Sequence, residues 1–478
     1  MSVIAGWLVP HPPLIFPEVG RGREKEIKAT VDAFRVAGAE IAAAAPDTIV
    51  VVSPHAAMYA DYFHVSPGRD AYGDMLAYGV SGVKVHADYD EEFVQELERE
   101  CEASGIPAGT QGERDSALDH ATMIPVRFVN EAFSLGINTA SPKGCFPSYV
   151  RVGVSGLPVP EHYLLGKAIA ATSEKLGRKT VVIASGDLSH RLMDSDPYSY
   201  APEGPEFDKA VCEVAGNADF GRLLAMDAGF LEKAGECGHR PLVVMAGALD
   251  RKVIESRLYS YEGPFGVGYG IASFVCAGGG ESEDEGRAFL DQHLKAELEQ
   301  AAARQEIESP HVALARATVE NLVKTGRMYS SPEPLPEALT ADRAGVFVSI
   351  KKHGALRGCI GTITPVTKNV GEEIRANAVS AATRDPRFNT IEEDELPFLE
   401  YSVDVLAPTE PVGSADALDP AKYGVIVSLG DKRGLLLPDL EGIEDSETQI
   451  RVAMRKAGIA EENRAKVRLE RFEVVRYK

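Results

Sequence analysis

The sequence feature that most constrains the fold is a run of β-branched residues that leads directly to a histidine. Residues 48–56 read TIVVVSPHA, and five of the first six are β-branched, which is typical of a strand buried on both faces of a parallel sheet. Pro54 cannot donate to a β-ladder, so His55 should lie just past the carboxyl end of this strand. Ligands of open α/β sheets bind at that edge. His55 is therefore a candidate metal ligand or acid–base group.

The same arrangement recurs along the first half of the chain. Residues 180–190 read TVVIASGDLSH, residues 2–9 predict a first strand, and an Asp-His pair precedes the apolar run ATMIPVRFV. The histidines at these strand exits or segment starts are His11, His55, His120 and His190. Each alone is compatible with a polar residue that has a backbone partner, but the repetition predicts one shared site. Asp187, in the last exit, should orient a neighbouring group or cap the following turn.

The histidine pattern predicts metal chemistry. Two neutral imidazoles and one carboxylate can hold Fe(II) and leave three positions for O₂ and a chelating substrate. The remaining histidines could then move protons.

The length and segmentation of the chain predict two domains. A chain of 478 residues exceeds what one hydrophobic core usually supports. Strand–helix–strand alternation predicts an α/β domain over residues 1–277. The run AGGGESEDEG at 277–286 has the composition of a flexible connection, so residues 278–309 should form a linker and a connecting helix. Residues 310–478 have a mixed pattern that predicts a smaller α+β domain.

Composition excludes several classes of partner. The formal charge of −22 argues against nucleic acid and anionic membranes. The N-terminal segment lacks a basic leader and is interrupted by prolines, and no long apolar run follows, so we expect neither a signal peptide nor a membrane span. Six cysteines without a CxxC pair suit a reducing cytoplasm. A homo-oligomer is compatible with the sequence.

Four segments carry a resemblance to a known family. HPPLIFPEVG, TIVVVSPHA, DHATMIPVRF and SGDLSH, in this order, resemble the LigB-type class III extradiol ring-cleavage dioxygenases and the Memo proteins, which share their fold. The resemblance covers about residues 1–275 and implies a mixed sheet with helices on both faces. It implies that His11 and His55 bind Fe(II), that His190 is the acid–base group, and that His120 lies beside substrate and O₂. The implied substrate is a small catechol- or aminophenol-like aromatic.

The third metal ligand is the point at which the two families differ. The dioxygenases use a glutamate ahead of an apolar helix, whereas Memo proteins have a cysteine in a similar place. This chain has both, as Glu236 and Cys237. A carboxylate suits Fe(II), whereas a thiolate favours softer ions such as Cu(I) or Zn(II). We predict Glu236, with Cys237 as the alternative and Glu262 as a less favoured candidate.

The C-terminal segment carries a second resemblance. GVFVSIKKHGALRGCIGTITP, ATRDPRF and YGVIVSLGDKRGLLLPDLEGI resemble the AMMECR-type domain, whose activity the resemblance does not supply. Cys359, near Arg357, is either a cation-stabilised thiolate or, the reading we favour, a cysteine packed in a sheet. Arg384 and Arg387 either clamp an anion or lie in a solvated turn.

Together the two halves resemble two of the three proteins of the AmmeMemoRadiSam grouping. The third is a radical-SAM protein, and this chain has no CxxxCxxC run, so that partner would be a separate polypeptide. Two functions follow as expectations. One is an Fe(II)-dependent extradiol-type dioxygenase with an appended AMMECR-type domain. The other is a Memo-like metal-binding redox or scaffold protein that works with a radical-SAM partner, and a cysteine ligand would favour it.

Overall fold

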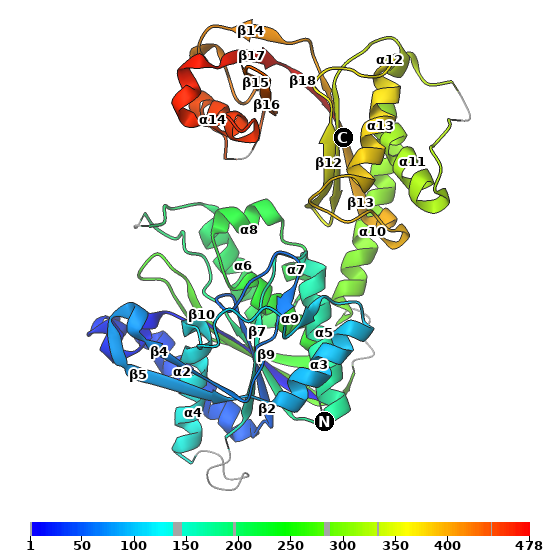
Figure 1. Ribbon diagram of the computed structural model, residues 1–478. Helices are drawn as coiled ribbons and strands as arrows, with labels where there is room; N and C mark the ends of the chain where they lie inside the picture. Colours follow the sequence, from blue (N-terminus) through cyan, green and yellow to red (C-terminus); the bar gives the residue numbers. More distant parts are fainter. Residues whose placement is uncertain (1, 137–145, 195–196, 282–286, 332–333, 441) are drawn as a thin grey trace. The chain divides into compact units, whose positions relative to one another are not determined.

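The computed structural model describes residues 2–136, 146–194, 197–281, 287–331, 334–440 and 442–478 (Figure 1). The chain forms two compact units, residues 1–295 and 296–478, which divide within helix α10 (Phe289–Ile307). This division falls inside the segment that we predicted as linker and connecting helix. The flexible connection predicted at 277–286 is wrong in its first part, because strand β10 continues to Glu281, which pairs with Lys252. Residues 282–286 lie outside the described residues.

The first unit is built on a six-stranded mixed sheet with the order β7-β2-β8-β1-β10-β9. Its four parallel strands are β1 (Val3–Val9), β2 (Thr48–Ser53), β7 (Ser148–Gly153) and β8 (Thr180–Ser185). Strands β9 (Lys252–Glu262) and β10 (Tyr269–Glu281) complete the sheet as an antiparallel pair. The predicted mixed sheet is confirmed.

Helices cover both faces of this sheet, and alternating residues of each strand reach the two cores. In β2, Val50 and Val52 pack in one core, whereas Ile49 and Val51 pack in the other. The first core includes residues of α3 (Glu91–Ala103), α5 (Val159–Leu176), α6 (Glu203–Asn217) and α9 (His239–Ala248). The second includes α2 (Lys28–Ala44) and α4 (His120–Ser134). Burial on both faces is the reason that the strand is continuously β-branched.

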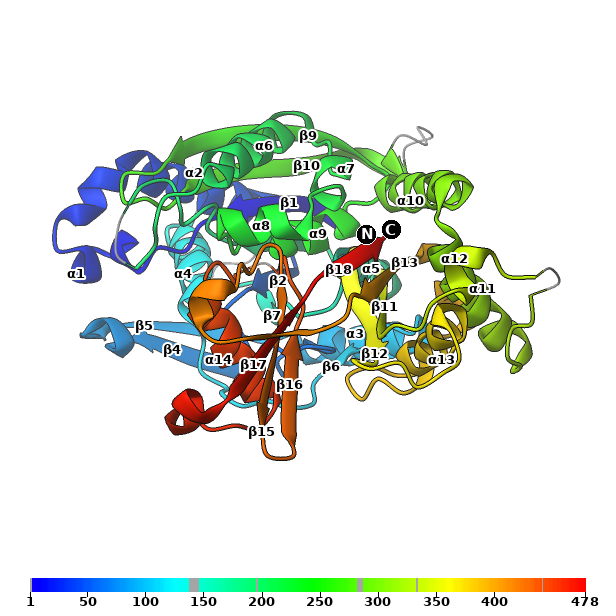
Figure 2. The ribbon, with the colours of Figure 1, turned by 90° about the horizontal axis from the view of Figure 1, so that it is seen from above.

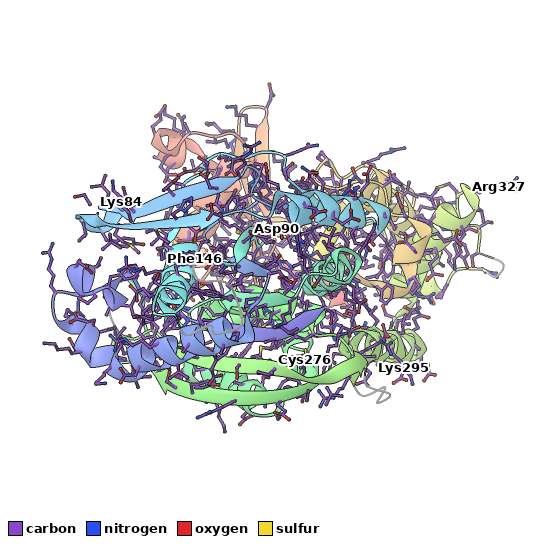
Figure 3. The ribbon with its side chains drawn as sticks, turned by 90° about the horizontal axis from the view of Figure 1, so that it is seen from below. Lys84, Asp90, Phe146, Cys276, Lys295 and Arg327 are labelled. Atoms are coloured by element: carbon purple, nitrogen blue, oxygen red, sulfur yellow. The ribbon has the colours of Figure 1, made fainter. Side chains whose placement is uncertain are left out.

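The order of the strands determines where the histidines lie. β2, β8 and β1 are adjacent and parallel, with Val52 opposite Ala184 and Val9 opposite Ser185. Their carboxyl ends therefore meet at one edge, where His11 follows β1 and His55 follows β2. Strands β4 (Asp70–Met75) and β5 (Val80–Asp88), the latter carrying Lys84, form a separate ribbon beside the main sheet (Figure 2, Figure 3).

The second unit contains two four-stranded antiparallel sheets, which confirms the predicted α+β class. The first has the order β12-β11-β13-β18 and consists of β11 (Val346–Lys352), β12 (Ala355–Gly361), β13 (Leu399–Leu406) and β18 (Val474–Tyr477). Helices α11 (Pro310–Thr325) and α13 (Val370–Thr383) share its core. The second sheet packs with α14 (Ser446–Lys456) and has the order β14-β17-β15-β16. Its strands are β14 (Glu410–Val412), β15 (Gly424–Leu429), β16 (Lys432–Leu436) and β17 (Arg468–Phe472). Within the described part of the chain, no helix is long and apolar enough to cross a membrane.

Candidate metal centre

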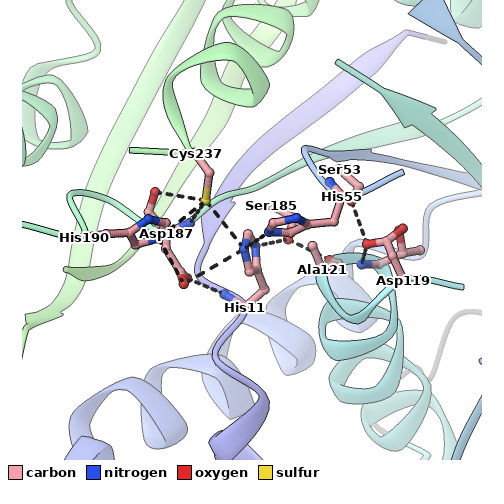
Figure 4. A network of polar contacts seen from close by, with 10 residues as sticks. His11, Ser53, His55, Asp119, Ala121, Ser185, Asp187, His190 and Cys237 are labelled. Atoms are coloured by element: carbon pink, nitrogen blue, oxygen red, sulfur yellow. Dashed lines mark hydrogen bonds and ion pairs between the residues drawn. The ribbon is translucent and has the colours of Figure 1, made fainter. Parts of the chain in front are cut away.

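Three side chains at the sheet edge point their donor atoms at one another (Figure 4). His11 Nε2 lies 3.1 Å from His55 Nε2 and 3.6 Å from Cys237 Sγ, and the three donor atoms lie within 4.8 Å of one another. Ligands around one tetrahedral ion should be about 3.4 Å apart for two imidazoles and about 3.6 Å apart for an imidazole and a thiolate. The spacing of these donors therefore fits a single metal ion.

The hydrogen bonds of His11 fix which ring nitrogen can bind a metal. His11 Nδ1 lies 3.2 Å from Ser185 Oγ, and Ser185 donates its only hydroxyl proton to the Ala121 carbonyl at 2.6 Å. Ser185 must therefore accept from His11, so Nδ1 carries the ring proton. The lone pair of Nε2 then faces His55 and Cys237, as a metal ligand requires.

Cys237 reaches the histidines because the exit of β8 packs directly against the start of α9. A Cβ placed on Gly186 would lie 2.2 Å from the Gly238 Cα, so only glycine allows this approach. The Asp187 backbone N–H donates to Cys237 Sγ at 3.3 Å. Burial, followed by the charges of Asp187 and Glu236, raises the pKa of the Cys237 thiol well above its ordinary value. The thiol is therefore protonated at neutral pH until a metal displaces the proton.

The imidazoles are already in the form that binds metals. Burial lowers the pKa of His11 to about 4, and desolvation also lowers the pKa of His55 and His120. All three rings are therefore neutral at pH 7. Burial opposes ionisation of Asp187, but the neighbouring His11 and His190 outweigh it, so the pKa of this carboxyl lies below its ordinary value. Asp187 and Asp119 both place negative charge near these histidines.

The two histidines predicted to move protons lie beside the donor atoms. His190 Nε2 is 4.0 Å from Cys237 Sγ and 3.9 Å from Asp187 Oδ2. The His120 ring centre is 4.5 Å from that of His55 and 5.2 Å from that of His11. The structure thus brings all four predicted histidines together. The Nε2 atoms of His11 and His55 face each other, and His120 and His190 lie next to this pair.

Comparisons with known proteins agree with this arrangement. Residues 5–272 match the family described as the catalytic LigB subunit of aromatic ring-opening dioxygenase. The chain belongs to the LigB family. Residues 312–477 match the AMMECR1 family, so the same chain also carries an AMMECR1 domain.

Relatives match either the whole chain or about a third of it. A Clostridium acetobutylicum protein is 35% identical, with 100% of both chains covered. A Thermotoga maritima protein is 49% identical and covers 36% of this chain and 98% of its own length. The crystal structure of an uncharacterized Pyrococcus horikoshii protein is 30% identical over 35% of this chain and 88% of its own, with a TM-score of 0.33.

The carboxylate that we predicted as third ligand is engaged elsewhere in this LigB-family member. Glu236 Oε2 accepts the His239 backbone N–H at 2.6 Å, at the start of α9. Helix N-termini have unpaired N–H groups that attract carboxylates. Glu236 is not part of the donor group, and burial raises its pKa to about 7. Glu262 accepts from the backbone N–H and hydroxyl of Thr30, each at 2.8 Å. Cys237, our alternative, is the side chain that the structure brings to the histidines.

Several residues around the centre have no distinguishing signal in the sequence. Ser185, which fixes the His11 ring, belongs to the small-residue exit of β8, and its role depends on the distant Ala121 carbonyl. Tyr198 stacks on His190 with ring centres 5.2 Å apart, and Tyr78 meets the His120 ring edge-on at 5.6 Å. Both tyrosines belong to segments outside the main sheet.

In the AMMECR1 domain, the charged residues near Cys359 are paired with carboxylates. Arg357 makes two hydrogen bonds to Glu395, at 2.9 and 2.8 Å. Arg387 pairs with Asp385, which also accepts the Cys359 backbone N–H. Arg384 is exposed. Arg357 is thus directed to a carboxylate, which favours the sheet-packed reading of Cys359 and the solvated-turn reading of the two arginines.

Proposed function

We propose that the LigB-type unit is a metal-dependent oxidoreductase, related in its site to the Memo proteins, with its metal held by His11, His55 and Cys237. The observation that carries this proposal is the identity of the third donor, a thiol in place of a carboxylate. Thiolate and imidazole ligands suit copper and zinc, whereas carboxylate ligands suit harder ions. Copper is the proposed metal, because it can also change oxidation state.

The remaining residues of the site have definable tasks. A bound copper ion would supply one-electron chemistry. Asp187 holds the His11 backbone through a 2.7 Å hydrogen bond and places a negative charge between His11 and His190. His190, part-exposed and next to the thiol, is placed to exchange a proton with a substrate that enters from solvent. His120 offers a further neutral imidazole beside the rings of His55 and His11.

A second candidate function is Fe(II)-dependent extradiol cleavage of a catechol- or aminophenol-like ring with O₂. The observation that favours it is the pair of spare imidazoles, His120 and His190, which a ring-cleaving enzyme would need for proton transfer. The membership of the LigB family agrees with it. For either function we further propose a separate radical-SAM protein as partner, on the basis of the sequence resemblance.

The experiment is a metal titration of the full-length, metal-free protein with Cu(I), Cu(II), Zn(II) and Fe(II) added separately. We expect one copper per chain and, for Cu(II), a visible thiolate charge-transfer band that disappears in Cys237→Ser and persists in Glu236→Gln. Loss of metal in Glu236→Gln, with binding retained in Cys237→Ser, would overturn the proposal. Iron binding combined with O₂ consumption in the presence of catechols or 2-aminophenols would establish the second candidate.

A further inference from the structure

A single carboxylate, Asp119, holds the loop that carries His55. Ser53 Oγ donates to Asp119 Oδ1 at 2.7 Å, and Ser53 Oγ in turn accepts the His55 backbone N–H at 3.1 Å (Figure 4). Ser53 is the last residue of β2 and is fully buried. The backbone of His55 is therefore tied, through one hydroxyl group, to a residue of another segment.

The same carboxylate also fixes the start of the helix that carries His120. Asp119 is the N-cap of α4, and its Oδ1 accepts the Thr122 backbone N–H at 3.0 Å. Its Oδ2 accepts the Thr122 hydroxyl at 2.9 Å. His120 is the first residue of α4, so its backbone position depends on this cap. Two histidines of the site, one past the end of β2 and one at the start of α4, thus share one anchor.

A buried cation lies behind this anchor. Arg151, on β7, is only 2% exposed, and its guanidinium remains charged at every pH of interest. Its Nη1 donates to the Ala117 carbonyl at 2.6 Å and lies 3.8 Å from Asp119 Oδ2. Its Nε donates to Ser66 Oγ at 2.6 Å. A buried charge needs such partners. Because Ala117 and Asp119 are partners of Arg151, the segment that leads to Asp119 is held against the sheet.

We infer that Asp119, backed by Arg151, is the positioning residue of the metal centre. It acts through Ser53 and the α4 cap and sets the distance between the His55 and His120 rings. The inference rests on the proposed metal site. Asp119 positions residues of that site but is not itself a metal ligand. Groups that orient ligands from outside are worth about 10–100-fold in metal affinity, so removal of the Ser53 link should weaken metal binding by that factor.

The test compares Ser53→Ala and Asp119→Asn with the matched control Ser173→Ala in the full-length protein. Ser173 is also fully buried and its hydroxyl contacts the Arg178 carbonyl and Thr180 Oγ1, but it lies near the opposite end of β8. Copper affinity should fall about 10–100-fold in the first two variants, with a changed visible spectrum. The control should bind copper as the wild type does, whatever its loss of thermal stability.

A second measurement does not depend on metal. With labelled histidines in the metal-free protein, the His55 and His120 rings, 4.5 Å apart, should show a nuclear Overhauser contact that Ser53→Ala weakens and Ser173→Ala retains. Copper affinity within twofold of wild type and an unchanged ring contact in folded Ser53→Ala would overturn the inference, even if Asp119→Asn fails to fold. A wild type that binds no copper would overturn the proposed function, and the ring contact alone would then decide the positioning role.

Discussion

Cys237 in the first unit and Cys359 in the second are both half-buried thiols with a polar atom close by, yet their surroundings differ in kind. Cys237 Sγ lies within 4.0 Å of two imidazole nitrogens, from His11 and His190. Cys359 Sγ accepts a hydrogen bond from Ser349 at 3.2 Å, and the arginines near it are paired with carboxylates. The difference indicates that a thiol gains metal-binding capacity from converging segments and not from its own local sequence.

The conspicuous motif around Cys359 has an explanation in packing. A Cβ on Gly358 would lie 2.3 Å from the Ala381 carbonyl oxygen of α13, and one on Gly361 would lie 2.2 Å from the Phe347 ring. Close approach of α13 to the sheet therefore requires Gly358, whereas Gly361 leaves room for the Phe347 side chain of the neighbouring strand β11. Around Cys237 the glycines Gly186 and Gly238 also permit close approach, but there the approach brings together two segments that carry donor atoms.

The largest expected effect comes from exchange of the two cysteines for alanine. Cys237→Ala should weaken copper binding by more than the roughly 100-fold that an outer-shell group is worth, because it removes a donor atom. Cys359→Ala should leave the affinity unchanged. Competition titration with a copper chelator measures both. Equal losses in the two variants would show that the comparison between the units is wrong.

Replacement of His190 should separate proton transfer from metal binding. His190→Gln should retain the metal and lower turnover by about 10²–10⁴, the usual contribution of a positioned proton-transfer group. His55→Ala should lose metal and activity together, because its Nε2 faces that of His11. Metal content and rate are measured on both variants side by side. A His190→Gln protein purified without metal would make His190 a ligand.

The sequence predicted that the site lies at the carboxyl edge of the sheet, but it did not decide between Glu236 and Cys237 as the third donor. Runs of β-branched residues followed by Pro or Gly locate strand ends, and adjacent parallel strands bring those ends together, so His11, His55 and His190 could be grouped in advance. His120 begins a helix, and strand ends alone do not place it. Whether Glu236 or Cys237 turns inward depends on the contact between Gly186 and Gly238 and on the unpaired N–H groups of α9. Both are consequences of tertiary packing, which the local sequence does not encode.

The metal affinity of the first unit should rise with pH. The pKa of Cys237 is raised well above its ordinary value by burial, so binding a metal to the thiolate releases one proton at neutral pH. The pKa of His11 is about 4, so this ring is already neutral and releases none. The affinity should therefore increase about tenfold per pH unit between pH 6 and pH 8. Titrations at three pH values measure the slope, and a flat profile would contradict a protonated Cys237.

The smallest expected effect tests the packing explanation in the second unit. Gly358→Ala places a Cβ against the backbone of α13, and overpacking of this kind costs about 1–3 kcal/mol in the free energy of unfolding. Gly413→Ala is the matched control in the same unit, because nothing lies within 4 Å of its added Cβ and the loss of a glycine in the unfolded chain is neutral or slightly stabilising. Urea unfolding of the full chain, followed with a probe in the second unit, measures both. Copper affinity should be unchanged in each variant, since neither position belongs to the first unit. If Gly358→Ala left stability intact but abolished an activity of the AMMECR1 domain, the glycine would be required for a ligand and not for the helix.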